Sequence, residues 1–201
     1  MIEERWTDLM KAFGLSANLE TYHISNAAYR ERHRAYHTHE HISACLRWLD
    51  DVEDLAEYPR EIELALWFHD AIYKPFSKTN EADSADMAKA FMQANNMSDA
   101  QIARVTHMIN ITAGHAPETG DPALMLDIDL SILGAKPHVY DMFEQHIRRE
   151  YRWVPSFMFK NGRRKILSYF LGRERLYNTD YFHERLETQA KENLRRALSV
   201  L

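Results

Sequence analysis

Hydrophobic positions along the chain recur at the three- to four-residue spacing of amphipathic helices. Ser98 and Gln101 form the residue pair of a capping box, and apolar residues then follow on one face at Ile102, Val105 and Ile109. No stretch keeps the period-two alternation of a half-buried strand for long enough to matter. The pattern therefore predicts helices throughout.

Proline, glycine and aspartate mark where these helices begin and end. Pro59 is expected to start a helix that is apolar on nearly all sides and therefore central. Asp121 is the expected N-cap of a later apolar helix that stops near Gly134. Further helices are expected from Pro137 and from about Asp180.

The predicted fold is all-α, a helical bundle of roughly eight to ten helices. Three short loops are expected between helices, at 74–80, 114–120 and 160–165. The chain of 201 residues is long enough to bury its own core. We expect one domain over 1–201, with 1–30 as an N-terminal helical extension and 137–201 as C-terminal helices packed on the core.

Composition excludes several classes of protein. Hydrophobic residues make up 45% of the chain and charged residues 27%, both ordinary for a soluble globular protein. The single cysteine, Cys45, excludes a disulfide framework and a cysteine-rich zinc site. No apolar run approaches the ~20 residues that cross a bilayer, and the N-terminus is acidic and amphipathic. We expect a cytoplasmic protein with no membrane partner.

Charge is spread unevenly along the chain. Between Arg148 and Arg175, nine lysines and arginines face only Glu150 and Glu174, so this segment carries +7 and the remainder −12. A basic face on an acidic protein suits an anionic ligand. The alternative is a solvated surface whose charges pair with acidic helices.

Three histidines stand at alternate positions in the stretch "HTHEH": His37, His39 and His41. On a strand, all three would project from one face as a metal-binding comb. On a helix, His37 and His41 share a face while His39 points toward solvent. An apolar stripe through Ile42 and Cys45 continues at helical spacing, which favours the helix.

Two further polar groups interrupt apolar segments. His69 and Asp70 stand together in the most apolar predicted helix, and burying them is costly unless each is satisfied. Imidazole with carboxylate suits a transition metal, although a hydrogen-bonded core histidine is the plainer alternative. Asp127 and Asp129 interrupt the stretch "LMLDIDLSILGA", where one can be solvated while the other caps a helix or pairs with an arginine.

The order of a histidine, a His-Asp pair and a later aspartate resembles the HD-domain superfamily of helical, metal-dependent phosphohydrolases. The likeness is closest to a bacterial subgroup of predicted HD-superfamily hydrolases and runs from about 32 to 198. The stretches that carry it are "YHTHEHI", "ELALWFHDAIY", "NEADSA", "LDIDLSILGA" and "IRREY", with "NGRRKIL" near the end. The resemblance implies an HD-type fold and a metal-dependent phosphohydrolase acting on a phosphomonoester or nucleotide through a metal-activated water.

The resemblance also implies a set of site residues. The metal ligands would be His41, His69, Asp70 and Asp129, with Asp127 as the alternative to Asp129. One divalent ion is expected, drawn from Mn, Fe, Co, Ni, Zn or Mg, because the additional histidines of two-metal members are not in clear register. The catalytic residues would be Asp70, His37 and Lys74. The substrate-binding residues would be Lys74, Arg34, His115 and Arg148.

Two other classes of function stay open. One is an HD-type di-iron oxygenase, which His37, His107 and His115 would have to complete. The other is a module that binds a nucleotide or RNA through the basic segment without catalysis. The expected partner is a small phosphorylated substrate rather than nucleic acid, and a homodimer is compatible with the sequence.

Overall fold

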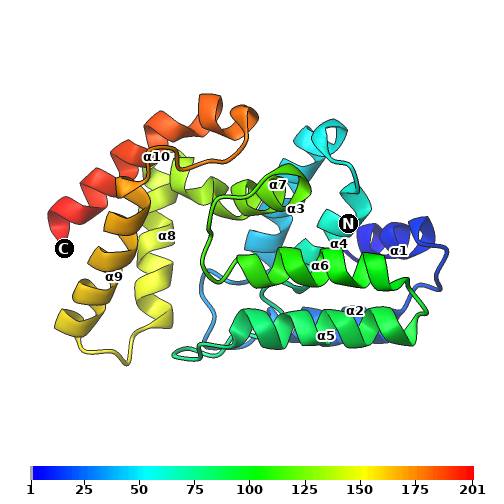
Figure 1. Cartoon of the computed structure of the whole chain (residues 1–201). Coiled ribbons are helices and arrows are strands. Elements are labelled where there is room, and N and C mark those ends of the chain that lie inside the picture. Colours follow the sequence, from blue (N-terminus) through cyan, green and yellow to red (C-terminus); the bar gives the residue numbers. More distant parts are fainter. Residues whose placement is uncertain (1) are drawn as a thin grey trace. The chain divides into compact units, whose positions relative to one another are not determined.

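The computed structural model describes residues 2–201, and within them it contains helices and no strand (Figure 1). The expected all-α class with eight to ten helices is confirmed. The ten α-helices are α1 (Ile2–Ala12), α2 (Leu19–Ala28), α3 (His39–Val52), α4 (Pro59–Phe68), α5 (Asn80–Ala94), α6 (Asp99–Ile111), α7 (Gly120–Asp129), α8 (Pro137–Glu150), α9 (Ser156–Gly172) and α10 (Asp180–Val200). Two 3-10 helices, η1 (Glu53–Leu55) and η2 (Leu130–Gly134), complete the set.

The chain forms two compact units. The first extends to Leu126 and the second runs from Asp127 to Leu201, so the boundary falls inside α7. In the described residues, no helix combines the length and the apolar character needed to cross a membrane.

Helix α4 is the centre of the first unit. Every side chain from Glu61 to Phe68 is buried, as its all-round apolar pattern predicts. Helices α1, α3, α5 and α6 all pack against it, and α5 and α6 lie side by side in Figure 1. At the contact with α1, the rings of Trp6 and Trp67 meet edge to face with centroids 5.5 Å apart.

Two glutamates on α4 are buried and each has a cationic partner. The guanidinium of Arg104 donates two hydrogen bonds of 2.7 Å to the carboxylate of Glu61. Arg5 Nε lies 2.9 Å from Glu63 Oε1. Burying a carboxylate away from water costs free energy unless the group is paired. These two ion pairs offset that cost on the buried helix.

Most predicted helix starts are confirmed. The capping box of Ser98 and Gln101 is formed at the start of α6, and Pro59, Pro137 and Asp180 are the first residues of their helices. The expected loops at 74–80 and 114–120 are also found.

Asp121 is not the N-cap of α7, because the helix already begins at Gly120, which has a φ of +63°. The Asp121 carboxylate instead accepts the backbone N–H groups of Glu57 and Tyr58, at 2.8 and 2.7 Å, just before α4. Asp121 was predicted to cap its own helix, whereas its carboxylate stabilises the residues just before α4.

The expected loop at 160–165 is wrong, because this segment is the middle of α9. Arg163 is buried and donates to both carboxylate oxygens of Glu144, at 3.0 and 2.7 Å. Leu167 and Phe170 follow on the same buried face. Packing of this face outweighs the preference of Asn161 and Gly162 for a turn.

The second unit is built around α10. Asn193 Nδ2 donates to the carbonyl oxygens of Leu133 and Ala135, which ties α10 to η2. The hydroxyl of Tyr177 donates to the carbonyl of Leu130 at 3.1 Å. Helices α8 and α9 lie side by side in Figure 1, joined by a short turn.

Candidate metal centre

Helix α3 carries the first candidate ligand, His41, in its first turn. The helix begins at His39, with Thr38 as N-cap accepting the N–H of Glu40 at 3.3 Å. His37 precedes the helix, so the prediction that His37 and His41 share a helical face is wrong. The two rings are nevertheless neighbours, with centroids 6.2 Å apart.

His39 also differs from its prediction. It was expected to face solvent but is half-buried, and its Nε2 lies 3.1 Å from the carbonyl oxygen of Asn26. Burial lowers the pKa of His39, although the hydrogen bond to Asn26 opposes this effect. His39 therefore links α3 to α2 and does not belong to the candidate centre.

His69 and Asp70 lie in the turn that follows α4, not inside the helix as predicted. The helix ends at Phe68, and His69 N donates to the carbonyl of Ala65 at 2.8 Å as the chain leaves it. Adjacent side chains diverge by ~100° within a helix. In the turn they converge, because His69 Nε2 lies only 3.1 Å from Asp70 Oδ2.

The ring of His69 has a fixed tautomer. Its Nδ1 lies 2.9 Å from the carbonyl oxygen of Leu66, which can only accept, so Nδ1 carries the proton. Nε2 is then the nitrogen with a lone pair. A backbone carbonyl that fixes the tautomer in this way is a common second partner of metal-binding histidines.

Three potential ligand atoms of the first unit lie together. His41 Nε2 is 3.1 Å from His69 Nε2, and Asp70 Oδ2 is 3.6 Å from His41 Nε2. Two ligands bound tetrahedrally to an ion at ~2.1 Å stand about 3.4 Å apart. The spacing of these three atoms therefore matches that of ligands around one ion.

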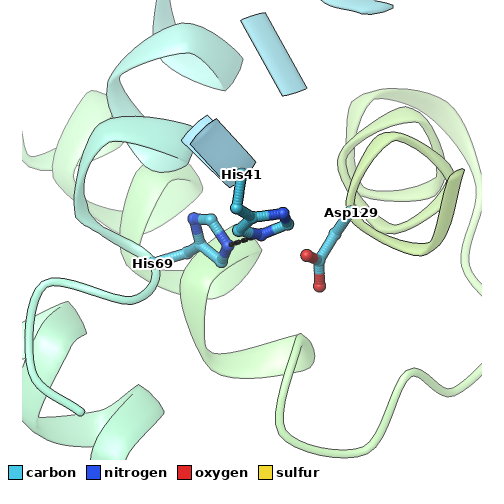
Figure 2. Close-up of side chains that lie close together, drawn as sticks. All are labelled: His41, His69 and Asp129. Atoms are coloured by element: carbon cyan, nitrogen blue, oxygen red, sulfur yellow. Dashed lines mark hydrogen bonds between the residues drawn. The ribbon is translucent and has the colours of Figure 1, made fainter. Parts of the chain in front are cut away.

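Asp129 lies near the same two histidines. His41, His69 and Asp129 each offer one ligand atom, and these atoms lie within 4.8 Å of one another (Figure 2). Asp129 is the last residue of α7, a continuous helix that begins in the first unit at Gly120. This group could hold a metal ion.

Asp127 has a different environment. One of its oxygens accepts from the backbone N and the side chain of Asn178, at 2.7 and 2.9 Å, and the other accepts from the backbone N and hydroxyl of Thr179, both at 2.7 Å. Burial raises the pKa of Asp127, and these hydrogen bonds oppose the rise. Of the two aspartates, the structure brings only Asp129 together with the histidines.

The pKa of Asp70 lies well below its ordinary value. Burial alone would raise it, but the neighbouring imidazoles of His69, His37 and His41 outweigh that effect because they favour the ionised form of the carboxyl. Asp70 is therefore an ionised carboxylate beside two imidazoles, as a metal ligand must be.

Arg34 is buried and holds the turn that carries Asp70. Its Nε donates to Glu31, one terminal nitrogen donates to the carbonyls of Asp70 and His37 at 2.6 and 3.3 Å, and the other donates to the carbonyl of Ala71 at 3.0 Å. The guanidinium thus ties the residues before α3 to the turn after α4. Sequence reasoning predicted a substrate-binding role for Arg34 and missed this one.

Aromatic rings surround the same arginine and histidines. The Arg34 guanidinium carbon lies 5.2 Å from the ring centroid of Tyr29 and 5.4 Å from that of Tyr73. Tyr73 also stacks on His37 at 4.2 Å, and Tyr36 lies 4.8 Å from His41. The contacts of Tyr73 with Arg34 and His37 join segments far apart in the chain, so the sequence pattern could not predict them.

Cys45 is a second residue that sequence reasoning did not connect to the centre. It is buried one helical turn after His41, and its sulfur lies 3.7 Å from His41 Nδ1. The spacing of four residues on a predicted helix was the available signal.

The remaining predicted residues have other environments. Lys74 is exposed, and its backbone N and O bond the side chain of Asn80, which closes the loop 74–80. His115 is half-buried in the loop after α6, with a φ of +48°. Arg148, in the second unit, donates to the carbonyls of Tyr151 and Val154 and so stabilises the turn after α8.

Comparison with known proteins gives no identification. No family model matches the chain, and no curated protein or solved structure matches it either.

Proposed function

We propose that this chain is a metal-dependent phosphohydrolase of the HD type, acting on a phosphomonoester or nucleotide. The observation that carries the proposal is the cluster of His41 Nε2, His69 Nε2 and Asp70 Oδ2 within 3.6 Å of one another. Two buried imidazoles and an ionised carboxylate suit a divalent transition metal better than calcium, which prefers oxygen ligands alone.

His41, His69, Asp70 and Asp129 would hold one divalent ion. When bound, such an ion lowers the pKa of a coordinated water and polarises a phosphoryl oxygen. Asp70 has a low pKa, which makes it a weak base, so its role is to ligate the ion and orient the water.

His37 is the proposed proton-transfer residue. Its ring stacks on Tyr73 and lies beside His41, so it has a defined position next to the ligands. Lys74 is the proposed phosphate-binding residue, because it is exposed and follows Asp70 by four residues in a loop closed by Asn80. The substrate would be a small phosphorylated molecule, in keeping with the expected cytoplasmic location.

Metal content is the decisive measurement. We expect elemental analysis to find about one ion per chain in the purified protein, and expect His69→Ala and Asp129→Ala to lose it while they remain folded. Asp127→Asn is the matched control, because Asp127 bonds Asn178 and Thr179. Full metal occupancy in both ligand variants would contradict the proposed centre.

Activity is the second measurement. Phosphate release is followed across a panel of nucleotides and phosphoesters with Mn, Co, Ni, Fe and Mg. We expect the wild-type protein to release phosphate from at least one of these compounds and His69→Ala to release none. Two bound irons per chain with an iron-specific absorption spectrum would favour an oxygenase instead. Bound metal without turnover of any ester would weaken the hydrolase assignment.

A further inference from the structure

Helix α9 of the second unit has an unusual amount of exposed apolar surface. Of its 17 residues, only Arg163, Leu167 and Phe170 are buried. Large exposed hydrophobic side chains gather on it and on the turn before it: Trp153, Phe157, Met158, Ile166 and Tyr169. Trp153 is 79% exposed and Phe157 68%, and contiguous apolar surface of this kind marks an interaction site.

Three of these side chains form a stripe. Met158, Ile166 and Tyr169 are separated by eight and three residues, spacings that place them on one side of the helix. Gly162 lies between Met158 and Ile166, and nothing stands within 4 Å of the position where its Cβ would be. Trp153 and Phe157 extend the apolar surface to the turn between α8 and α9.

Cationic side chains lie on this stripe and beside it, since Lys165 follows Met158 by seven residues, two helical turns. No acidic residue occurs from 151 to 173, whereas six lysines and arginines do. Arg163 is used internally by Glu144, but Arg152, Arg164 and Lys165 are exposed. The five apolar side chains together with Arg152, Arg164 and Lys165 are called the α9 surface below.

We propose that the α9 surface binds the surface of a membrane that contains anionic lipids. Exposed Trp, Phe, Met and Ile beside Lys and Arg are typical of helices that lie in the membrane interface. The basic side chains would contact lipid phosphates while the apolar ones enter the acyl boundary. Such contact requires no spanning helix. The inference is independent of the metal centre, and it departs from the expectation that no membrane is a partner.

Other occupants fit less well. A second copy of this chain would bring two surfaces of the same charge together. Nucleic acid would use the aromatic rings, but Met158 and Ile166, in the middle of the stripe, offer neither stacking nor hydrogen bonds. A small ligand would need a concave site, whereas a single helix presents a convex one.

Co-sedimentation with vesicles tests the proposal. We expect the full-length protein to bind vesicles of equal parts phosphatidylglycerol and phosphatidylcholine, and not vesicles of phosphatidylcholine alone. Because the chain has a net charge of −5, the protein as a whole should be repelled, so binding reports the local basic surface. Binding should weaken as salt is raised.

Paired variants separate the surface from general charge. Arg164→Glu with Lys165→Glu should lower vesicle affinity by at least about tenfold. Arg47→Glu with Lys89→Glu makes the same change in net charge at two exposed sites of the first unit and should have a clearly smaller effect. Equal losses in the two double variants would overturn the proposal.

The apolar part has its own control. Trp153→Ala with Phe157→Ala should reduce binding, whereas Ile24→Ala with Leu55→Ala, which are also exposed, should not. Circular dichroism confirms that each variant is folded. Failure of the wild-type protein to bind anionic vesicles would refute the proposal, as would binding to a single-stranded oligonucleotide that displaces it from the vesicles.

Discussion

Asp127 and Asp129 lie two positions apart on α7, but the surroundings of their carboxylates differ. The Asp127 carboxylate accepts four hydrogen bonds from Asn178 and Thr179. The Asp129 carboxylate lies close to the rings of His41 and His69. The sequence identified both as polar interruptions of an apolar segment. It could not distinguish them, because the residues that bond Asp127 are some 50 positions away in the chain.

The two aspartates should respond to mutation in opposite ways. Asp127→Asn replaces one acceptor oxygen with a donor facing other donors, so we expect it to destabilise the protein by about 2–4 kcal/mol in urea unfolding. Asp129→Asn should change stability little in the presence of chelator but should reduce metal affinity. If Asp127→Asn lost metal and Asp129→Asn kept it, the assignment of the two residues would have to be exchanged.

Arg34 acts on the centre through backbone carbonyls rather than through substrate. Arg34→Lys removes the planar group that reaches the carbonyls of Asp70 and Ala71 together, so we expect metal affinity to fall by roughly 10–100-fold. The metal affinity is measured by titrating the protein with Co²⁺ and recording the visible absorption of the bound ion.

A matched arginine provides the control. Arg104 makes a bidentate pair with Glu61 in the same unit, so Arg104→Lys should lower stability and leave Co²⁺ affinity unchanged. Wild-type affinity and an unchanged Co²⁺ spectrum in folded Arg34→Lys would show that Arg34 does not position the centre.

At the scale of helices, the sequence predicted which segments are helical better than it predicted where each helix ends. The starts of α4, α6 and α8 follow from local signals, a proline or a capping box, and were found. The start of α10 was expected from the spacing of its apolar residues and was also found. The end of α4 has no such signal, since the six residues after Phe68 include neither glycine nor proline. Because His69 and Asp70 lie just beyond that end, their convergence could not be predicted from helical spacing.

Two glycines illustrate why local signals can mislead. Gly134, at the end of η2, has no room for a side chain: a Cβ there would lie 2.6 Å from Leu186 Cβ and 2.9 Å from its carbonyl oxygen. Gly162 has open space around it and lies inside α9, where the sequence predicted a loop.

Alanine substitutions at these two positions should therefore change the free energy of unfolding in opposite directions. Gly134→Ala should destabilise the protein by about 1–3 kcal/mol, because α10 would have to shift. Gly162→Ala should stabilise it by roughly 0.5–1 kcal/mol, the usual gain of alanine over glycine within a helix. Urea unfolding of both variants is the measurement, and destabilisation by Gly162→Ala would argue against the helical assignment of 160–165.

At the scale of the molecule, the structure shows how the basic segment is used. Arg148 bonds the turn after α8, Arg163 pairs with Glu144, and Arg175 pairs with Asp180. The sequence located the segment and its net charge of +7. It could not show that these three arginines have partners in the fold while others on α9 face outward.

Metal binding should raise the stability of the whole protein. His41 and His69 are 28 residues apart, so the unfolded chain does not hold them together, and an ion that binds the folded state stabilises it. At a free metal concentration of about 100 times Kd, the gain is about 2.7 kcal/mol. For a chain of this length that corresponds to a rise in Tm of roughly 5–10 °C. Thermal unfolding with Mn²⁺ or Co²⁺ should show this rise, chelator should reverse it, and His69→Ala should lack it. An equal rise in His69→Ala would place the stabilising ion elsewhere in the molecule.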